Sequence, residues 1–223
     1  MSLEIGNPPW ILLGWNEQSV LADSNPMFAI KNLTATQTTK ERTAALENQD
    51  IREQYLSEYE MMTGEQNFLN ATVNYPLLKG QKANLYKCFL PLSIQVVSSQ
   101  KNNGGVFAFL HPEGIFDDSY GGKLRSILYR KICYHFQFEN ELNLFKGTND
   151  HGRMRFSLNV YRNNKDSIRF DTISNLFLPY TIDRCYQDSI STCELVPGIK
   201  DKNGKWETRG HHHRILNIGE LSS

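Results

Sequence analysis

Two stretches of this chain place apolar residues at the three- and four-residue spacing of one helical face. In the charged stretch 39–63 these positions are Ile51, Tyr55, Tyr59 and Met62. In the stretch 84–100 they are Leu85, Phe89, Leu92 and Val96. Pro91 lies inside the second stretch and should kink it, because a proline costs about 3 kcal/mol in a helix interior. The pattern predicts two amphipathic helices, the second ending at the Asn-Asn-Gly-Gly sequence 102–105.

Short apolar runs bounded by glycine, proline or polar residues predict strands. Residues 3–5 are expected to end a buried strand, and residues 106–110 form a second run of strand length. A further helix is expected after Gly121-Gly122, and two more strands at 136–139 and 155–161, joined through a polar turn at 147–152. This order predicts an α/β fold with right-handed crossovers. The pattern weakens after Phe170, and residues 206–218 are predicted to be a polar tail.

Composition narrows the class of protein. The 223 residues suffice for one sizeable core or one domain with extensions, and 39% hydrophobic with 22% charged residues indicates a globular chain. No apolar run approaches the ~18 residues that span a bilayer, and the first residues lack the apolar core of a signal peptide. The four scattered cysteines form no CxxC pair. They indicate reduced thiols in a cytoplasmic protein, without zinc or disulfides.

Charge is balanced overall but uneven along the chain. Equal numbers of basic and acidic residues, 24 of each, disfavour a stand-alone DNA-binding protein. Residues 120–169, however, contain ten Lys or Arg against four acids. This excess is either a solvated mixed surface or a strip that faces phosphates. The candidate phosphate contacts within it are Lys123, Arg125, Arg153 and Arg155.

The residues with the clearest chemistry are Asn7-Pro8-Pro9-Trp10, directly after Gly6. In such a turn the Asn side-chain oxygen and the first proline carbonyl can accept both hydrogen bonds of an exocyclic amine. The prolines fix φ and add no N–H donors, so the carbonyl keeps its direction. The Trp ring can stack on a planar base. The other interpretation is a rigid surface turn, in which Asn and Pro are common.

The tetrapeptide resembles the catalytic motif of DNA adenine-N6 methyltransferases, which use S-adenosylmethionine (SAM). Six further segments follow it in the order that this family uses: 84–87, 104–110, 111–114, 121–125, 135–142 and 156–161. Together they resemble the large bacterial methylases of type IIG restriction-modification and BREX-like systems. Residues 3–10 and 84–162 carry the resemblance, somewhat under half of the chain, and residues 206–211 add a weaker match.

The resemblance implies a SAM-dependent methyltransferase fold, a seven-stranded sheet with helices on both faces. This chain is expected to hold the second half of that fold, a partial Rossmann-like α/β fold without the SAM-binding half. The reason is that only Met1 to Ile5 come before Gly6 and the Asn7-Pro8-Pro9-Trp10 motif. The expected domains are a partial catalytic domain, 1–165, with a helical insertion at about 26–83, and an extension, 166–223. The extension would lead toward a missing target-recognition region.

The resemblance also implies the partner and the site. Enzymes of this family flip an adenine out of double-stranded DNA. Asn7 and the Pro8 carbonyl would hold its N6, Trp10 would stack on one face, and Phe145 would cover the other. Phe145 equally fits a core position at a strand end. His111 and Glu113 are interpreted as supports, because methyl transfer from a sulfonium needs positioning more than acid–base help.

No metal is expected, because Asp117-Asp118 and His211-His212-His213 lack the spacing of metal ligands. Three functions stay open: a fragment of an adenine-N6 methyltransferase, inactive by itself; a catalytically inactive remnant or structural piece; and a protein-glutamine or RNA methyltransferase. The chain is expected to bind SAM weakly or not at all, because it has no glycine-rich strand-to-helix turn. The sheet edge left open would favour aggregation.

Overall fold

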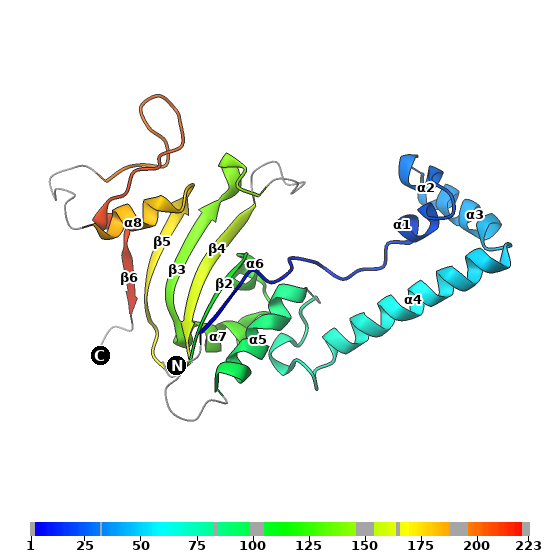
Figure 1. Ribbon diagram of the computed structural model, residues 1–223, viewed down its shortest axis with the longest axis horizontal. Coiled ribbons are helices and arrows are strands. Elements are labelled where there is room, and N and C mark those ends of the chain that lie inside the picture. Colours follow the sequence, from blue (N-terminus) through cyan, green and yellow to red (C-terminus); the bar gives the residue numbers. More distant parts are fainter. Residues whose placement is uncertain are drawn as a thin grey trace. The chain divides into compact units, whose positions relative to one another are not determined.

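The computed structural model describes residues 3–31, 33–82, 84–98, 105–145, 154–163, 166–187 and 196–219. The chain divides into two compact units. The larger unit contains Met1–Trp10 and Leu85–Ser223, and the smaller contains Ile11–Asn84 (Figure 1).

The described part of the larger unit is built on a six-stranded mixed sheet with the order β1-β2-β4-β3-β5-β6. The strands are β1 (Leu3–Gly6), β2 (Val106–Pro112), β3 (Ile132–Glu139), β4 (Arg155–Arg162), β5 (Arg169–Leu176) and β6 (Leu216–Gly219). Two pairs of strands are parallel, β1 with β2 and β3 with β5. Three pairs are antiparallel: β4 with β2, β4 with β3, and β6 with β5. β1, β2, β3 and β5 therefore end at the same edge, which we call the carboxyl edge. The predicted α/β class is confirmed.

The two faces of the sheet differ because successive strand residues point to opposite sides. One face is covered by α5 (Leu85–Ser98), α6 (Gly114–Asp117) and α7 (Gly122–Lys131), and we call it the α5 face. On it, Tyr86 of α5 stacks on the His111 ring at 5.6 Å. The opposite face, the α8 face, packs against α8 (Tyr180–Tyr186). Its core cluster consists of Phe136, Phe138, Phe156, Ile173, Leu176 and Cys185.

The strand predicted at residues 3–5 is confirmed as β1, but its predicted burial is wrong. Leu3 and Ile5 are 64% and 73% exposed. Among the described strands, β1 pairs with β2 alone, so it lies at the edge of the sheet and nothing described covers its outward residues.

The helix predicted at 84–100 is confirmed as α5 and continues through Pro91. The apolar face identified by the spacing, however, is not the face that packs against the sheet. Phe89, Leu92 and Val96 are exposed, whereas the buried positions on the helix include Tyr86, Leu90, Ser93 and Val97. Ser93 donates a hydrogen bond to Glu4 Oε1 of β1 at 3.0 Å, which fixes the side of α5 that faces the sheet. Both sides of the helix carry apolar residues, so spacing alone could not choose between them.

The stretch after Phe170, where the pattern weakens, contains a strand and a helix, and the predicted polar tail 206–218 contains a turn and most of a further strand. β5 lies inside the sheet between β3 and β6, and its Ile173 and Leu176 are fully buried. α8, the turn η3 (His212–Arg214) and β6 follow it. The predicted domain boundary at residue 165 stays a prediction, although the strands on its two sides share one sheet.

The smaller unit is helical. It contains α1 (Glu17–Ala22), α2 (Met27–Ile30), α3 (Ala35–Ala45), α4 (Gln49–Asn70) and the turn η1 (Pro76–Leu78). The single helix predicted at 39–63 is divided because the Asn48 side chain accepts hydrogen bonds from Asp50 N and Ile51 N, which starts α4. Trp15 packs edge-on against Tyr55 and Tyr59. No helix in the described ranges is long and apolar enough to cross a membrane.

Candidate functional site

The turn Asn7–Trp10 leaves the carboxyl end of β1. Gly6, the last residue of β1, lies beside Phe109 of β2, and a Cβ on Gly6 would stand 3.3 Å from the Phe109 ring. Pro8 is buried, whereas Asn7 and Pro9 are exposed. The Asn7 side chain makes no hydrogen bond to any described residue. Its amide is therefore presented to solvent at the carboxyl edge.

Trp10 is fixed to the neighbouring strand. Its indole Nε1 donates a hydrogen bond to the Leu110 carbonyl of β2 at 3.3 Å. The centroid of its ring lies 5.2 Å from that of Phe145, with an angle of 52° between the two ring planes. The centroid of the Phe156 ring is 6.0 Å away. The half-buried indole thus packs against the core cluster of the α8 face. The turn and the aromatic ring are held by two different strands.

Phe145 is positioned by a side chain to which the sequence assigned no role. Asn140 opens the turn η2 (Asn140–Leu142) after β3 and is 1% exposed. Its Oδ1 accepts from Phe145 N and its Nδ2 donates to Phe145 O, both at 3.1 Å. The Phe145 ring then meets Phe156 edge-on at 4.9 Å. An Asn directly after a strand was the available signal, because its amide can stand in for backbone partners in a turn.

The contact between Trp10 and Phe145 bears on the expected adenine sandwich. A planar base between two parallel rings needs roughly 7 Å, twice the contact distance of about 3.5 Å. The two ring centroids are 5.2 Å apart and the rings are tilted. The sandwich stays a prediction, and it requires the two rings to separate.

The predicted phosphate contacts have different surroundings. Arg125 donates hydrogen bonds to the Ile115 carbonyl at 3.2 Å and to the Asp118 carbonyl, so its guanidinium braces the connection between α6 and α7. Arg155 pairs with Glu139 at 2.8 Å and is 59% exposed. Lys123 is exposed on α7, and Arg153 lies outside the described residues. Binding of phosphate by these four side chains stays a prediction.

His111 belongs to a buried polar network on the α5 face. It lies within β2, one strand position beyond Leu110, and is fully buried. Its Nδ1 donates to the Pro112 carbonyl at 2.9 Å, and its Nε2 accepts from Asn159 Nδ2 at 3.0 Å. Burial lowers the pKa of His111 to about 4, so the ring is neutral at pH 7. It acts as a brace between β2 and β4.

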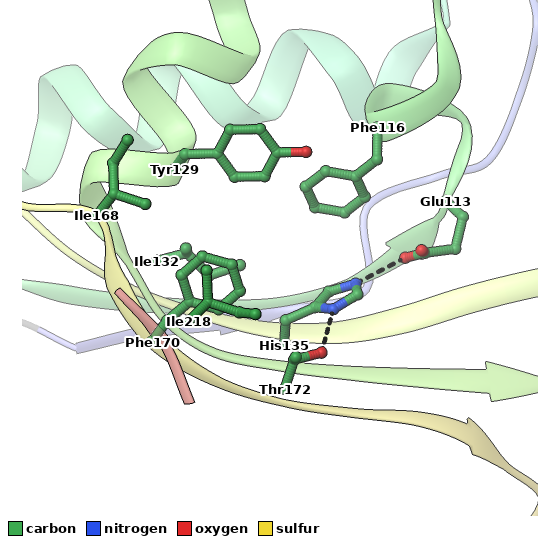
Figure 2. A pocket seen from close by; sticks show the side chains of 9 residues that line it. All are labelled: Glu113, Phe116, Tyr129, Ile132, His135, Ile168, Phe170, Thr172 and Ile218. Atoms are coloured by element: carbon green, nitrogen blue, oxygen red, sulfur yellow. Dashed lines mark hydrogen bonds and ion pairs between the residues drawn. The ribbon is translucent and has the colours of Figure 1, made fainter. Parts of the chain in front are cut away.

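Glu113 and His135 continue this network at a pocket of about 410 Å³ (Figure 2). Glu113 Oε1 lies 3.2 Å from His135 Nε2, and its Oε2 accepts from Gln137 Nε2 at 3.0 Å. His135 Nδ1 is 2.9 Å from Thr172 Oγ1. Burial opposes ionisation of Glu113, but the hydrogen bond and charge of His135 lower its pKa overall.

The rest of the pocket is mainly apolar, and its remaining lining residues are Phe116, Tyr129, Ile132, Ile168, Phe170 and Ile218. His111 and Glu113 thus support strands from the face opposite Trp10. In the ranges that the structure describes, no three His, Cys, Asp or Glu side chains converge as metal ligands would.

Comparison with known proteins gives structural likenesses only. No family model matches this chain, and no curated protein matches it. The type ISP restriction-modification enzyme LlaBIII bound to DNA is similar over 78% of this chain and 10% of its own, at 12% identity and a TM-score of 0.38. The DrdV–DNA complex is similar over 78% of this chain and 14% of its own, at 14% identity and a TM-score of 0.38.

A nuclease-deletion mutant of the type ISP enzyme LlaGI, in complex with a DNA substrate mimic, is similar over 78% of this chain and 14% of its own, at 13% identity and a TM-score of 0.36. This chain therefore spans 10% to 14% of the length of these three proteins. Likenesses at this level assign no role to any residue. The solved structures to which the chain is similar include restriction-modification enzymes.

Proposed function

We propose that this chain carries the adenine-binding part of a SAM-dependent DNA adenine-N6 methyltransferase of a restriction-modification or phage-defence system. One observation carries the proposal: the exposed Asn7 amide follows β1 directly, and Trp10 is anchored beside it to the Leu110 carbonyl. Ligands of open α/β sheets bind outside the carboxyl ends of the strands, where both groups lie.

In the proposed mechanism Asn7 Oδ1 and the Pro8 carbonyl accept the two N6 hydrogen bonds of a flipped adenine. This arrangement turns the amine lone pair away from the purine ring. Trp10 stacks on the base, and its bond to Leu110 keeps the indole in place. When bound, SAM supplies an electrophilic methyl group. The chain's own contribution is orientation, which can lower a barrier by about 7–11 kcal/mol.

The described residues do not fit SAM itself. The β2–α6 connection is Glu113 alone and the β5–α8 connection is residues 177–179, so neither of these two strand-to-helix turns is glycine-rich. We therefore place the SAM site in another part of the enzyme. The order β1-β2-β4-β3, with an antiparallel β4 between parallel strands, supports the second half of a Rossmann-like methyltransferase sheet.

The contact of Trp10 with Phe145 favours one alternative, a structural piece without catalysis. In that case the two rings would remain packed as part of the core, and no base would bind between or beside them. The two proposals differ in whether Trp10 meets adenine, which can be measured without SAM.

The test uses Trp10 as a fluorescent reporter. The chain has three tryptophans, so replacing Trp15 and Trp206 by Phe leaves Trp10 alone. This variant is titrated with an oligothymidine that carries one central adenosine, and with the same oligomer carrying cytidine or thymidine there. We expect saturable quenching of Trp10 that is strongest for adenosine. Asn7→Ala should remove the preference for adenosine. Equal quenching by all three oligomers would contradict the proposal.

A further inference from the structure

We propose that residues 199–214, together with Arg184 of α8, bind the phosphate backbone of duplex DNA. The cations of this C-terminal basic surface are Arg184, Lys200, Lys202, Lys205 and Arg209. The inference rests on the proposed function, because it locates the DNA that a methyltransferase would hold. It does not depend on the phosphate contacts predicted from the sequence, which lie within residues 123–155.

A tight hairpin presents three of the lysines. Lys200 and Trp206 pair as an antiparallel bridge, and Glu207 N donates to the Ile199 carbonyl at 2.9 Å. Asp201 Oδ1 accepts from Asn203 N at 2.8 Å and Lys205 N at 2.9 Å. The one acid of the hairpin tip is thus engaged with the turn's own amides. Lys202 and Lys205 are exposed at the tip.

Three cations are held by fixed partners. Lys200 Nζ lies 4.3 Å from the centre of the Trp206 ring, and the Arg184 guanidinium lies 4.7 Å from that of Tyr180. Arg209 donates to Glu207 through Nε at 3.0 Å and Nη2 at 2.7 Å. The Glu207 side chain is 5% exposed, whereas that of Arg209 is 66% exposed. Long side chains held in this way lose less conformational entropy when they bind a phosphate.

The C-terminal basic surface packs closely against α8. The buried Thr181 hydroxyl donates to the Thr208 carbonyl at 2.8 Å. A Cβ on Gly210 would stand 2.3 Å from Arg184 Cβ, so this close approach requires glycine. Arg214 donates to the carbonyls of Arg209 at 2.8 Å and Asn175 at 3.0 Å. Residues 208–214, at the base of the hairpin, are therefore held in a fixed position relative to the sheet.

This position lies on the same face of the sheet as the candidate site. Ile182 of α8 and Ile215 pack against the same core cluster as Trp10 and Phe145, on the α8 face. The hairpin, drawn in orange, extends beyond the end of the sheet at which the β3 arrow terminates (Figure 1). Phosphates bound there would flank a base that reaches Trp10.

The excess of positive charge on this surface favours a polyanionic partner. Residues 199–214 contain five Lys or Arg and two acids, a local excess of +3 in a chain whose net charge is zero. Both acids have partners: Asp201 accepts from the turn's amides and Glu207 from Arg209. The hydrogen bonds of Arg209 lower the pKa of Glu207 to about 2, so the Glu207 carboxylate is ionised at pH 7. A polyanion such as the DNA backbone complements such a surface.

The test measures binding of the full chain to a fluorescein-labelled duplex of about 24 base pairs by anisotropy, at about 50 to 200 mM NaCl. Wild-type binding should be in the micromolar range at the lowest salt. Lys200→Ala/Lys202→Ala/Lys205→Ala should weaken it roughly tenfold or more and lower the slope of log K against log salt by about 0.9 per lost contact. Lys202→Ala/Lys205→Ala leaves the Lys200–Trp206 contact intact and should give an intermediate loss.

The matched control, Lys31→Ala/Lys40→Ala/Lys79→Ala, removes the same charge from exposed positions of the smaller unit. It should change affinity by less than about twofold. An equal loss in both triple variants, an unchanged slope in the hairpin variant, or no wild-type binding at about 50 mM NaCl would each overturn the inference. If the hairpin variant loses affinity while Trp10 shows no preference for adenosine, the phosphate surface stands and the proposed function fails.

Discussion

Trp10 and Leu110 are 100 positions apart in the chain, yet the indole Nε1 of Trp10 donates a hydrogen bond to the Leu110 carbonyl at 3.3 Å. The contact exists because β1 and β2 are parallel neighbours, with Gly6 opposite Phe109. The turn after β1 therefore places its aromatic ring against the end of β2. The geometry of the candidate site depends on this strand pairing as much as on the turn.

Removing the indole donor should show how much this anchor contributes. Trp10→Phe keeps an aromatic ring but loses the hydrogen bond to Leu110, and we expect a loss of about 1 kcal/mol in the free energy of unfolding. Urea denaturation at pH 7 measures it. Trp15→Phe, in the smaller unit, is the control for ring replacement alone. An unchanged urea midpoint in Trp10→Phe would show that the anchor is not stabilising.

Asn140 should be required for the position of Phe145. Asn140→Ala removes both hydrogen bonds to the Phe145 backbone, at a cost of about 1–3 kcal/mol for the two together. The control is Asn143→Gly, three residues on, where φ is +55° and glycine is tolerated without strain. Thermal or urea unfolding should separate the two variants clearly. Equal stabilities would remove Asn140 from its assigned role.

Stability should fall with acid because His111 is buried and neutral. Its pKa is lowered from 6.5 to about 4, so the unfolded chain takes up the proton first as the pH falls. The stabilisation is fully present above pH 6.5 and is lost between pH 6.5 and about 4, on the order of 3 kcal/mol in all. The lowered pKa of the Glu113 carboxyl also makes the folded state less stable as the pH falls, over a lower range of pH.

Urea denaturation at a series of pH values tests this expectation. His111→Gln removes the titrating group, so its stability should depend less on pH between about 7 and 4 than that of the wild type. The variant will be less stable at pH 7, and only the slope is diagnostic. A slope identical to that of the wild type would contradict the assignment.

Asn7 should be essential for methyl transfer and dispensable for folding. In a polypeptide that also contains the SAM site, Asn7→Ala should abolish formation of N6-methyladenine while circular dichroism stays unchanged, because its exposed side chain contacts no described residue. Pro9, equally exposed, offers a nearby control in Pro9→Ala, which should retain more activity. N6-methyladenine production by Asn7→Ala would remove Asn7 from the catalytic role.

Calorimetric titration of this chain with SAM should show no micromolar binding, because neither the β2–α6 turn nor the β5–α8 turn is glycine-rich. The oligonucleotide titration on the same preparation shows that the protein is folded and competent. Micromolar affinity for SAM would mean that the chain holds a donor site after all.

The sequence predicted the parts of the fold that depend on local pattern. Strands β1 to β4 and helices α5 and α7 were expected near their observed places, because apolar runs and glycine stops act within a few residues. β5 was not expected. Its buried Ile173 and Leu176 are separated by polar residues, and only pairing with β3 and β6 makes it a strand of the sheet.

The residues Asn7 to Trp10 could be proposed as a site from the sequence because a proline pair fixes its own backbone and an Asn carries its own hydrogen-bonding groups. Their surroundings could not be read in the same way. The contact of Trp10 with Phe145, the Asn140 bonds behind it and the cations mounted on α8 all join residues distant in the chain. Such contacts arise from strand order and packing, which local spacing does not encode. The sequence by itself determined which hydrogen-bonding groups and which aromatic ring the turn carries, and the tertiary structure decided what anchors them and which residues share their face of the sheet.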